Sequence, residues 1–446
     1  MKKTLMLFGF IFFGFGLFAD TLNLEQVRTL ALLNSRSLAR SNLAVRGSLL
    51  DGRNQLYTML PSPSVRYDAS INYLDNNWGL IDNPLDTFNS GISFSLTQRI
   101  FNGGKDFILR NINAIATESA RKDALAEYFN VLDSADNAYY AVLEAAATLE
   151  AEESSLQTAI FSLNMAEIRH ASGMINMGDY LRALAEVEVR ENFRNQARRN
   201  LSLSIERLKI ITELDEIPPL QQIDLSEYEE LILHLGSISD AETDVLFDRF
   251  WVVFSAANPS LARAALNNQR AERNLSLTRR DPAPVVNATI FSGSIGYSAS
   301  GGFGNTSGGG ISITGTIPVD FWVFANRIER SKIALDSAAL DYKNTENALE
   351  IELYSVLLNT LGHAGSVLSS RRTLDYIEMH FEFIMERYRL LQSSISDMQE
   401  ASTMLINSRN GHTRALYGFL QSLSRLRSLG AIESEEKLTG LLMGDL

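Results

Sequence analysis

Cysteine is absent from the 446-residue chain. This absence excludes a disulfide framework, a thiolate metal site and an N-terminal lipidated cysteine. Proline occurs only nine times, so long stretches are free of the residue that most readily ends a helix. The stability of the fold must therefore come from packing or from association between chains.

Patterns of catalysis and of metal binding are also missing. The glycine-rich stretch "SGGFGNTSGGG" at residues 300–310 has no following Lys-Ser or Lys-Thr, which a phosphate-binding loop needs. No two histidines have the spacing of HExxH or of a similar ligand motif. The five histidines are His170, His234, His363, His380 and His412. We expect no enzyme activity, no cofactor and no bound metal.

Positive charge is scarce as well. The formal net charge is −13 at pH 7, whereas a nucleic-acid-binding surface is expected to be basic. We therefore expect no nucleic-acid partner. After residue 19, no stretch is long and apolar enough for a transmembrane helix.

The first 19 residues are typical of a secretory signal peptide. Lys2 and Lys3 precede an apolar core at residues 5–18, and Ala19 stands at a plausible cleavage point. The alternative, a short membrane anchor, needs a longer apolar run of roughly 18 residues. Cleavage would remove two lysines and no acid, which brings the net charge to −15.

The remaining chain looks duplicated at an offset near 220 residues. "LPSPSVRYDASINY" at 60–73 is similar to "DPAPVVNATIFSGS" at 281–294, and "ISFSLTQRIF" at 92–101 is similar to "ISITGTIPVD" at 311–320. Internal repeats of this kind determine the architecture. The expected parts are a signal peptide at 1–19, a first repeat at 20–212 (a helix, strands about 64–74 and 91–100, and a long helical hairpin at 105–212), a linker or equatorial segment at 213–245, a second repeat at 246–430 (a helix, strands about 285–299 and 310–319, and a long helical hairpin at 324–430) and a C-terminal tail at 431–446.

The expected strands alternate strictly between apolar and polar residues. Val65, Tyr67 and Ala69 are apolar, while the residues between them are polar. A half-buried soluble sheet gives the same alternation, but the small hydroxyl residues of the polar face suit a wet lumen. The Ser-Gly-Ser step at 292–294 shifts the parity, which predicts a β-bulge. Residues 75–90 and 300–310 are polar or glycine-rich and are expected to form loops.

The expected helices are far longer than a globular core requires. Apolar residues recur at spacings of three and four from 106 to about 169 and again from about 326 to 390. The first run alone makes a rod of roughly 95 Å at 1.5 Å per residue. Shorter antiparallel returns are expected at 179–211 and 397–429. Many residues of the apolar seam are alanine or serine, which favours close packing of several helices.

The segment "RIFNGGKD" at 99–106 leads from a strand directly into the first long helix. We interpret Gly103 and Gly104 as a joint at which the backbone bends from the strand into the helix, with Asp106 near the helix start, where a carboxylate suits the dipole. The second half makes the same passage through "PVDFW", beginning at Pro318, with no glycine pair.

In these features the chain resembles the TolC-like outer-membrane efflux protein family. The resemblance rests on "LNLEQVRTLALLNSRSL" at 22–38, the "RIFNGGKD" joint, and the tip stretches "RHASGMINMGDYLRALAE" at 169–186 and "RYRLLQSSISDMQEAS" at 387–402. It implies an α+β membrane protein: a homotrimer in which four β-strands per protomer form a 12-stranded transmembrane β-barrel, continued by a long antiparallel α-helical coiled-coil barrel in the periplasm. Independently, four strands cannot close a barrel, and lipid tolerates no open sheet edge.

The function implied by the resemblance is that of an outer-membrane exit duct. It would belong to a tripartite efflux or type I secretion system, with a periplasmic adaptor protein, an inner-membrane transporter and outer-membrane lipid as partners. The rival interpretation is a periplasmic structural or adhesion protein, a coiled-coil rod that carries a small soluble sheet. Detergent-dependent extraction and heat-modifiable migration would separate the two.

Candidate site residues fall into three groups. Asp397 and Glu400, three residues apart on a predicted helix, share a face, and a threefold tunnel would arrange each as a ring of three carboxylates; the alternative is an ordinary solvated face. By resemblance, the periplasmic aperture includes Asp397, Glu400 and Asp179, the adaptor contact at the helix tips includes Gly173, Met174, Ile175 and Ser394, and the barrel-to-tunnel joint includes Gly103, Gly104 and Pro318. A glycine at a helix end needs no such role, because the C′ position favours it. The second tip departs from the family pattern, since Leu391 stands in the place of Gly173, and serines replace a basic latch residue.

Overall fold

The computed structural model describes residues 21–71, 88–298, 302–305 and 308–444. The expected signal peptide lies outside the described residues, as do 72–74 of the first expected strand and most of the loop expected at 75–90. The chain divides into two compact units. The helical unit comprises the described residues up to Leu38, Glu127–Ala257 and Glu350–Leu446, and the sheet unit comprises Ala39–Ala126 and Asn258–Leu349.

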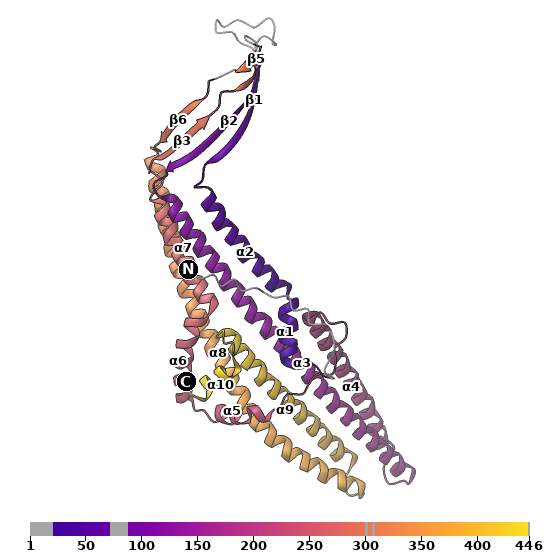
Figure 1. Ribbon diagram of the computed structural model, residues 1–446. Helices are drawn as coiled ribbons and strands as arrows, with labels where there is room; N and C mark the ends of the chain where they lie inside the picture. The colour runs from indigo at the N-terminus through magenta and orange to yellow at the C-terminus, as the bar shows by residue number, and fades with distance from the viewer. Residues whose placement is uncertain (1–20, 72–87, 299–301, 306–307, 445–446) are drawn as a thin grey trace. The chain divides into compact units, whose positions relative to one another are not determined.

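The sheet unit combines helices with a small antiparallel sheet (Figure 1). Its helices are α2 (Arg36–Tyr57), the first part of α3 (Lys105–Ala171), α7 (Pro259–Thr278) and the first part of α8 (Phe321–Arg389). Its strands are β1 (Ser62–Ile71), β2 (Phe88–Phe101), β3 (Val285–Phe291), β4 (Ile295–Ser298), β5 (Gly302–Asn305) and β6 (Gly310–Thr316). The stretch at 300–310, expected to be a loop, thus contains β5.

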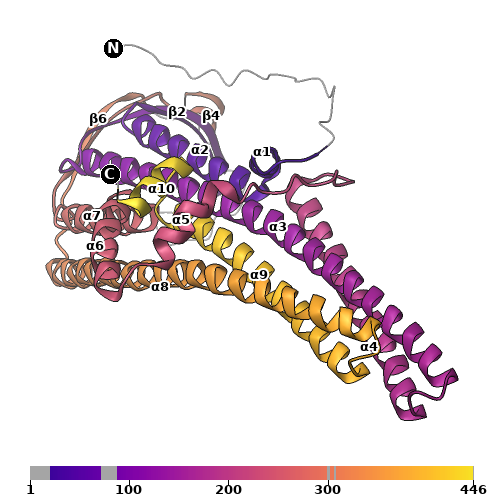
Figure 2. The same ribbon diagram turned by 90° about the horizontal axis from the view of Figure 1, so that it is seen from below.

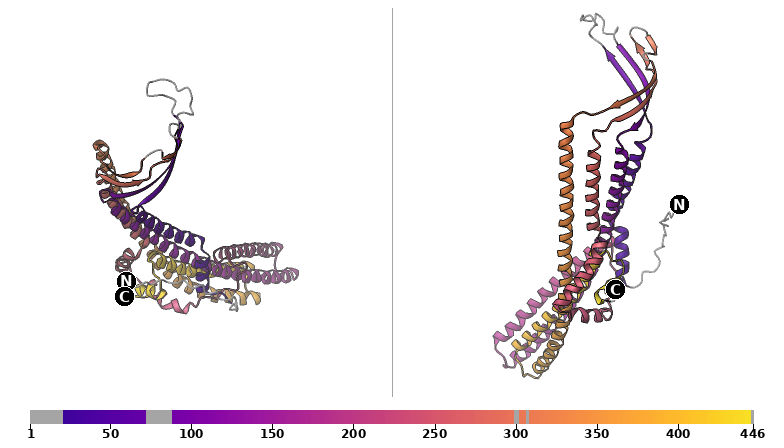
Figure 3. Two further views of the ribbon diagram at one scale, coloured as in Figure 1. Left: turned by 45° about the horizontal axis from the view of Figure 1, so that its top comes forward. Right: turned by 90° about the vertical axis from the view of Figure 1, so that its left-hand side faces the viewer.

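Strand β2 is the centre of the sheet. It pairs with β1 along one edge and with β3 and β4 along the other, while β6 pairs with β3 and β5 with β4 (Figure 3). β3 and β4 therefore share one strand position, and β5 and β6 share another. Phe291 of β3 pairs with Ser95 of β2, and Ile295 of β4 pairs with Ile92 of β2. The first and third of these residues are four positions apart, whereas their partners on β2 are three positions apart. The extra residue lies in the Ser-Gly-Ser step, where the change of parity predicted a bulge.

The two faces of the sheet differ in polarity. One face carries hydroxyl pairs, with 2.7 Å between the Oγ atoms of Ser64 and Ser95 and 3.1 Å between the Oγ1 atoms of Thr97 and Thr289. The other face is apolar and exposed. Its large side chains are Val65, Tyr67, Ile92, Phe94, Leu96, Ile290, Ile295, Tyr297, Phe303, Ile311 and Ile313. Within the described part of the chain, β1, β5 and β6 each pair with a single strand.

The helical unit contains two antiparallel helical hairpins, drawn side by side in Figure 2. The first joins the rest of α3 to α4 (Met177–Thr212), and the second joins the rest of α8 to α9 (Ile395–Leu429). Four shorter helices complete the unit: α1 (Leu24–Asn34), α5 (Ser226–Gly236), α6 (Asp240–Ala257) and α10 (Glu435–Met443). No helix among the described residues is both long and apolar enough to cross a membrane.

The core of the helical unit is built from aromatic and leucine side chains. Phe250 and Phe254 of α6 are fully buried, and Phe254 fills the space beside Gly430, where a Cβ atom would come within 2.4 Å of its ring. The segment expected as a linker at 213–245 contains α5 and the start of α6. The tail at 431–446 contains α10, a helix that the sequence did not lead us to expect, with Leu438, Leu441 and Leu442 buried.

Candidate functional sites at the helix tips and the strand-to-helix joint

The first tip, which joins α3 to α4, is a Schellman turn. The Met174 N–H donates to the Arg169 carbonyl at 2.8 Å, and the Gly173 N–H donates to the His170 carbonyl at 2.9 Å. Gly173 has a φ of +71° and open space around its missing Cβ, so the turn itself accounts for glycine at this position. Met174 is 64% exposed, whereas Ile175 packs against the tip core described below.

The second tip, which joins α8 to α9, repeats this turn without glycine. The Gln392 N–H donates to the Arg387 carbonyl at 2.8 Å, and the Leu391 N–H donates to the Tyr388 carbonyl at 3.2 Å. Leu391 has a φ of +63°, a region that costs an L-residue roughly 1–2 kcal/mol. Leucine in place of glycine at this position therefore leaves the turn intact but adds backbone strain to it.

We expect Leu391→Gly to raise the free energy of unfolding by roughly 0.5–1 kcal/mol, because relief of the left-handed strain exceeds the backbone entropy cost of glycine. Leu391 is 53% exposed, so little packing is lost. Thermal unfolding of the purified protein measures the change. The control is Leu390→Gly, which removes a similarly exposed leucine, at 58%, from a position without positive φ and should destabilise. Equal losses in both variants would contradict strain at Leu391.

Asp397 and Ser394 form a capping box at the start of α9. The Ser394 N–H donates to Asp397 Oδ2 at 2.9 Å, and the Asp397 N–H donates to Ser394 Oγ at 3.1 Å. The hydrogen bond from the Ser394 backbone, with that from its hydroxyl, lowers the pKa of the Asp397 carboxyl. Asp397 and Glu400 are both exposed, one turn apart on α9. The structure therefore brings together Asp397, predicted for the aperture, and Ser394, predicted for the adaptor contact.

Asp179, also predicted for the aperture, lies at the start of α4. Its backbone N–H donates to Asn176 Oδ1 at 2.9 Å, so Asn176 caps this helix as Ser394 caps α9. The Asp179 side chain is partly exposed. In the described part of the chain, no hydrogen bond or ion pair joins Asp179 to Asp397 or Glu400.

Arg169 connects the two tips, a role that the sequence did not reveal. Its side chain is buried, and its Nη2 donates to the Tyr388 carbonyl at the end of α8 while its Nη1 donates to the Ser393 carbonyl at 3.3 Å. The guanidinium lies 4.2 Å from the centroid of the Tyr388 ring. The sequence hinted at Arg169 in one way only: ten residues separate Arg169 from Asp179, as ten separate Arg387 from Asp397. Arg387 instead is exposed and donates to the Gln392 carbonyl at 3.1 Å.

Besides Arg169 of α3, two arginines of α4 form hydrogen bonds with α9. Arg190 is buried, and its Nη2 donates to Thr403 Oγ1 at 2.6 Å while its Nε donates to Glu186 at 2.6 Å. Arg182 donates to the Ser396 hydroxyl. Beneath these contacts lies the tip core, whose buried residues are Ala166, Ala183, Tyr388, Ile395 and Met398. The two hairpin ends are thus held together by both apolar packing and arginine hydrogen bonds.

The first strand-to-helix joint, in the sheet unit, requires its glycines. Gly103 and Gly104 have φ values of +71° and +74°, and a Cβ on Gly103 would lie 2.3 Å from the Ala283 Cβ. Arg280 donates from Nη1 to the Gly103 carbonyl at 2.8 Å. Asp106, in the first turn of α3, binds Arg99 of β2 at 3.0 Å, so its carboxylate ties the strand to the helix.

The second joint works without left-handed residues. None of the described residues 317–320 has a positive φ, and this stretch is free of regular structure, with Pro318 partly exposed. The Asp320 carbonyl accepts hydrogen bonds from the N–H groups of Val323 at 2.9 Å and Phe324 at 3.1 Å, which starts α8. Pro318, predicted for the joint, therefore stands in the short irregular connection that precedes the helix.

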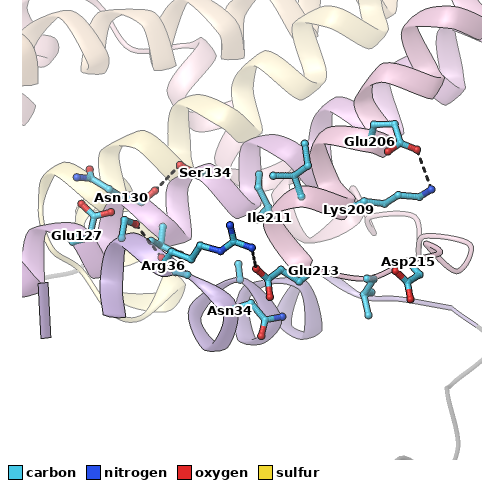
Figure 4. Close-up of a pocket in the computed structure, with 16 residues that line it drawn as sticks. Asn34, Arg36, Glu127, Asn130, Ser134, Glu206, Lys209, Ile211, Glu213 and Asp215 are labelled. Atoms are coloured by element: carbon cyan, nitrogen blue, oxygen red, sulfur yellow. Dashed lines mark hydrogen bonds and ion pairs between the residues drawn. The ribbon is translucent and has the colours of Figure 1, made fainter. Parts of the chain in front are cut away.

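The large groove of the helical unit offers no arrangement for catalysis. It has a volume of about 850 Å³ and is lined by the end of α1, the start of α2, α3 and the end of α4 (Figure 4). Four of its charged groups pair with one another, Arg36 with Glu213 at 2.9 Å and Lys209 with Glu206 at 2.9 Å, while Glu127 and Asp215 also line it. Among the described residues, no group of three or more His, Cys, Asp or Glu side chains is placed to hold a metal ion.

Solved structures with a similar fold include three outer-membrane proteins. The outer membrane channel CmeC of Campylobacter jejuni is 16% identical, with a TM-score of 0.73 over 93% of this chain and 88% of CmeC. The outer membrane protein VceC of Vibrio cholerae is 15% identical, with a TM-score of 0.72 over 91% of this chain and 96% of VceC. The open state of the outer membrane channel MtrE of Neisseria gonorrhoeae is 15% identical, with a TM-score of 0.61 over 91% of this chain and 88% of MtrE.

At these identities the likeness establishes the fold, and no curated protein sequence matches the chain significantly. The family is established by its sequence profile. The profile of the outer membrane efflux proteins matches residues 27–212 and 254–431, which is more than half of the chain. The chain therefore belongs to the outer membrane efflux protein family, whose members are outer-membrane channels and not enzymes.

Proposed function

We propose that the protein is the outer-membrane exit duct of a tripartite efflux or type I secretion system. In this proposal it assembles as a homotrimer and receives substrates from an inner-membrane transporter through a periplasmic adaptor protein. The observation that carries the proposal is the sheet: an exposed apolar face, a hydroxyl-bearing face, and edge strands that each have one partner in the described part of the chain.

The strand count supports a trimer, the number that the family resemblance implies. Among the described residues the sheet has four strand positions, those of β1, β2, β3 with β4, and β6 with β5. Its edges need partners, because lipid offers no hydrogen bonds to an open edge. Two copies would give a barrel of eight strands that its own side chains fill, whereas three copies give twelve strands and room for a pore. The apolar face would then contact lipid, and the serine and threonine face would line the lumen.

The helical hairpins would form the periplasmic tunnel. The two tips share one turn geometry and one capping scheme, which supports the proposed duplication into repeats at 20–212 and 246–430 around the segment at 213–245. Exposed Met174, with Gly173 and Ile175 beside it, would contact the adaptor at the first tip. Ser394 would contribute at the second tip, although its hydroxyl is already engaged in the cap.

The entrance of the tunnel would carry rings of carboxylates from Asp397 and Glu400, with Asp179 on the neighbouring tip. Acid rings favour cations and hold divalent cations in the pore. The low pKa of Asp397 keeps its carboxylate charged at neutral pH, as such a ring requires.

We expect the double variant Asp397→Asn, Glu400→Gln to lose this behaviour. Recorded in planar bilayers, the double variant should need at least about tenfold more divalent cation for half-block than the wild type does. Because Asp397 also caps α9, Ser394→Ala is the matched control: it breaks the capping box but keeps both acids, so block should persist. If the double variant is blocked at the same cation concentration as the wild type, the hypothesis of an acid ring is wrong. A wild-type protein released by osmotic shock as a soluble monomer would overturn the channel itself.

A further inference from the structure

A cluster of buried charges lies beneath the C-terminal helix α10, within the helical unit. Asp136 of α3 accepts hydrogen bonds from Arg28 Nε at 2.6 Å, from Arg427 Nη2 at 2.7 Å and from the Ser424 hydroxyl at 2.7 Å. The Arg28 side chain is 8% exposed, that of Arg427 is 5% exposed and that of Asp136 is 0% exposed. Helices α1, α3 and α9 therefore meet at one carboxylate.

The buried part of this cluster does not balance its own charge. Two guanidinium groups surround a single buried carboxylate, and an uncompensated buried cation is strongly unfavourable. Two more exposed carboxylates complete the cluster. Glu25 of α1 binds Arg28 Nη1, and Glu435 of α10 has its Oε1 2.6 Å from Arg28 Nη2 and 3.3 Å from Arg427 Nη1. Glu435 binds both arginines at once but stays 46% exposed. Glu25 is still more exposed, at 76%, but its ion pair is with Arg28, whereas Glu435 bridges Arg28 and Arg427.

The helix that supplies Glu435 is short and has weak support of its own. α10 has nine residues and no side-chain hydrogen bond at its N-cap, Ser434, and a helix of this length is unstable without packing. It contacts α5 and α6, and its Leu438, Leu441 and Leu442 are buried. A cavity of about 40 Å³ lies between it and the arginines.

We propose that Arg28 and Arg427 form a carboxylate-binding site, that the chain fills this site with its own Glu435, and that α10 is a releasable latch fastened by that carboxylate. The two guanidinium groups match the oxygens of a carboxylate by charge-assisted hydrogen bonds. Asp136 accepts hydrogen bonds from both arginines and from the Ser424 hydroxyl, so the site keeps its shape when Glu435 leaves. The ligand class is a carboxylate, from Glu435 in the closed state and from another molecule when α10 is undocked.

The test uses Glu435→Ala in the full-length purified protein, with acetate as the probe. Hydrogen exchange of the amides of α10 should become about tenfold faster in this variant, because the fastening of α10 is lost. Replacing chloride by acetate at constant ionic strength should restore the apparent Tm that the variant has lost, because acetate occupies the vacated site.

Glu436→Ala is the matched control, since Glu436 is exposed in the same turn of α10. It should exchange like the wild type and show no acetate effect. Unchanged exchange in Glu435→Ala, or the same acetate effect in both variants, would overturn the proposal. Should Glu435→Ala fail to fold, Glu435→Gln keeps the side-chain size and carries the exchange measurement. Both readouts are independent of conduction, so they stand apart from the proposed channel function.

Discussion

Asp136→Asn should lower the free energy of unfolding by roughly 3–5 kcal/mol, the usual cost of removing one partner from a buried ion pair. The loss is large because Asp136 is completely buried and serves Arg28, Arg427 and the Ser424 hydroxyl together. Asparagine keeps the volume but leaves two buried guanidinium groups with only the exposed carboxylates of Glu435 and Glu25 as charged partners. The measurement is the midpoint of thermal unfolding in detergent, compared with the wild type.

Asp133→Asn is the matched control, one helical turn away on α3. Burial raises the pKa of the Asp133 carboxyl, Arg425 Nη1 is 3.7 Å away, and Asp133 Oδ1 is buried without a hydrogen-bond partner among the described residues. Folding therefore disfavours the charged form of Asp133 relative to the unfolded chain, and we expect Asp133→Asn to be neutral or stabilising at neutral pH. A loss equal to that of Asp136→Asn would contradict the central place of Asp136 in the cluster.

The raised pKa of Asp133 predicts a dependence of stability on pH. A carboxyl whose folded pKa lies above its unfolded value stabilises the fold fully below the unfolded value, and this stabilisation is lost as the pH rises through the folded value. For Asp133 the loss should begin near its ordinary value of 3.8 and be complete above its raised pKa. In Asp133→Asn this part of the pH dependence of Tm should vanish.

Gly103→Ala should destabilise the joint by roughly 2–5 kcal/mol, which combines left-handed strain with overpacking. The new Cβ would lie 2.3 Å from the Ala283 Cβ, and the backbone there cannot retreat freely because Arg280 binds the Gly103 carbonyl. The measurement is the amount of heat-modifiable protein in the outer membrane fraction, together with its Tm.

Gly173→Ala separates strain from crowding. Gly173 has the same φ of +71° as Gly103, but no atom lies within 4 Å of its missing Cβ. This variant should lose only roughly 1–2 kcal/mol, the strain alone. If the two variants are equally destabilised, the close contact with Ala283 adds nothing to the cost of the Gly103 substitution, and left-handed strain alone explains both losses.

Periodic features of the chain were predictable, because local chemistry produces them. The long helices follow from apolar spacing without proline, and α3 runs from Lys105 to Ala171 where the pattern indicated a helix from 106 to about 169. The positive φ values of Gly103 and Gly104 agree with the bend that their sequence indicated. The Ser-Gly-Ser bulge was visible as a change of parity.

Features that depend on tertiary contacts could not be predicted. Arg28 and Asp136 are 108 residues apart, and nothing local in either segment indicates that they meet. Leu391 adopts the conformation of Gly173 because the turn at the second tip imposes it, against the preference of leucine. Arg169 and Arg387 occupy similar positions in sequence, yet only Arg169 is buried. Helix α10 forms because apolar partners are available to it, which a nine-residue pattern does not reveal.

The placement of β2 has a consequence for how the sheet is made. One edge of β2 pairs with β1, which is close in sequence, but the other edge pairs with β3, which is synthesised much later. Thr97 and Thr289, whose hydroxyls meet at this second edge, are 192 residues apart. While the later part of the chain is still being exported, the β1–β2 hairpin presents an open edge and an apolar surface, the state most prone to aggregation. Formation of the sheet is therefore bound to be a late and slow step, and a chain truncated before Val285 would leave this edge permanently unpaired and dependent on chaperones.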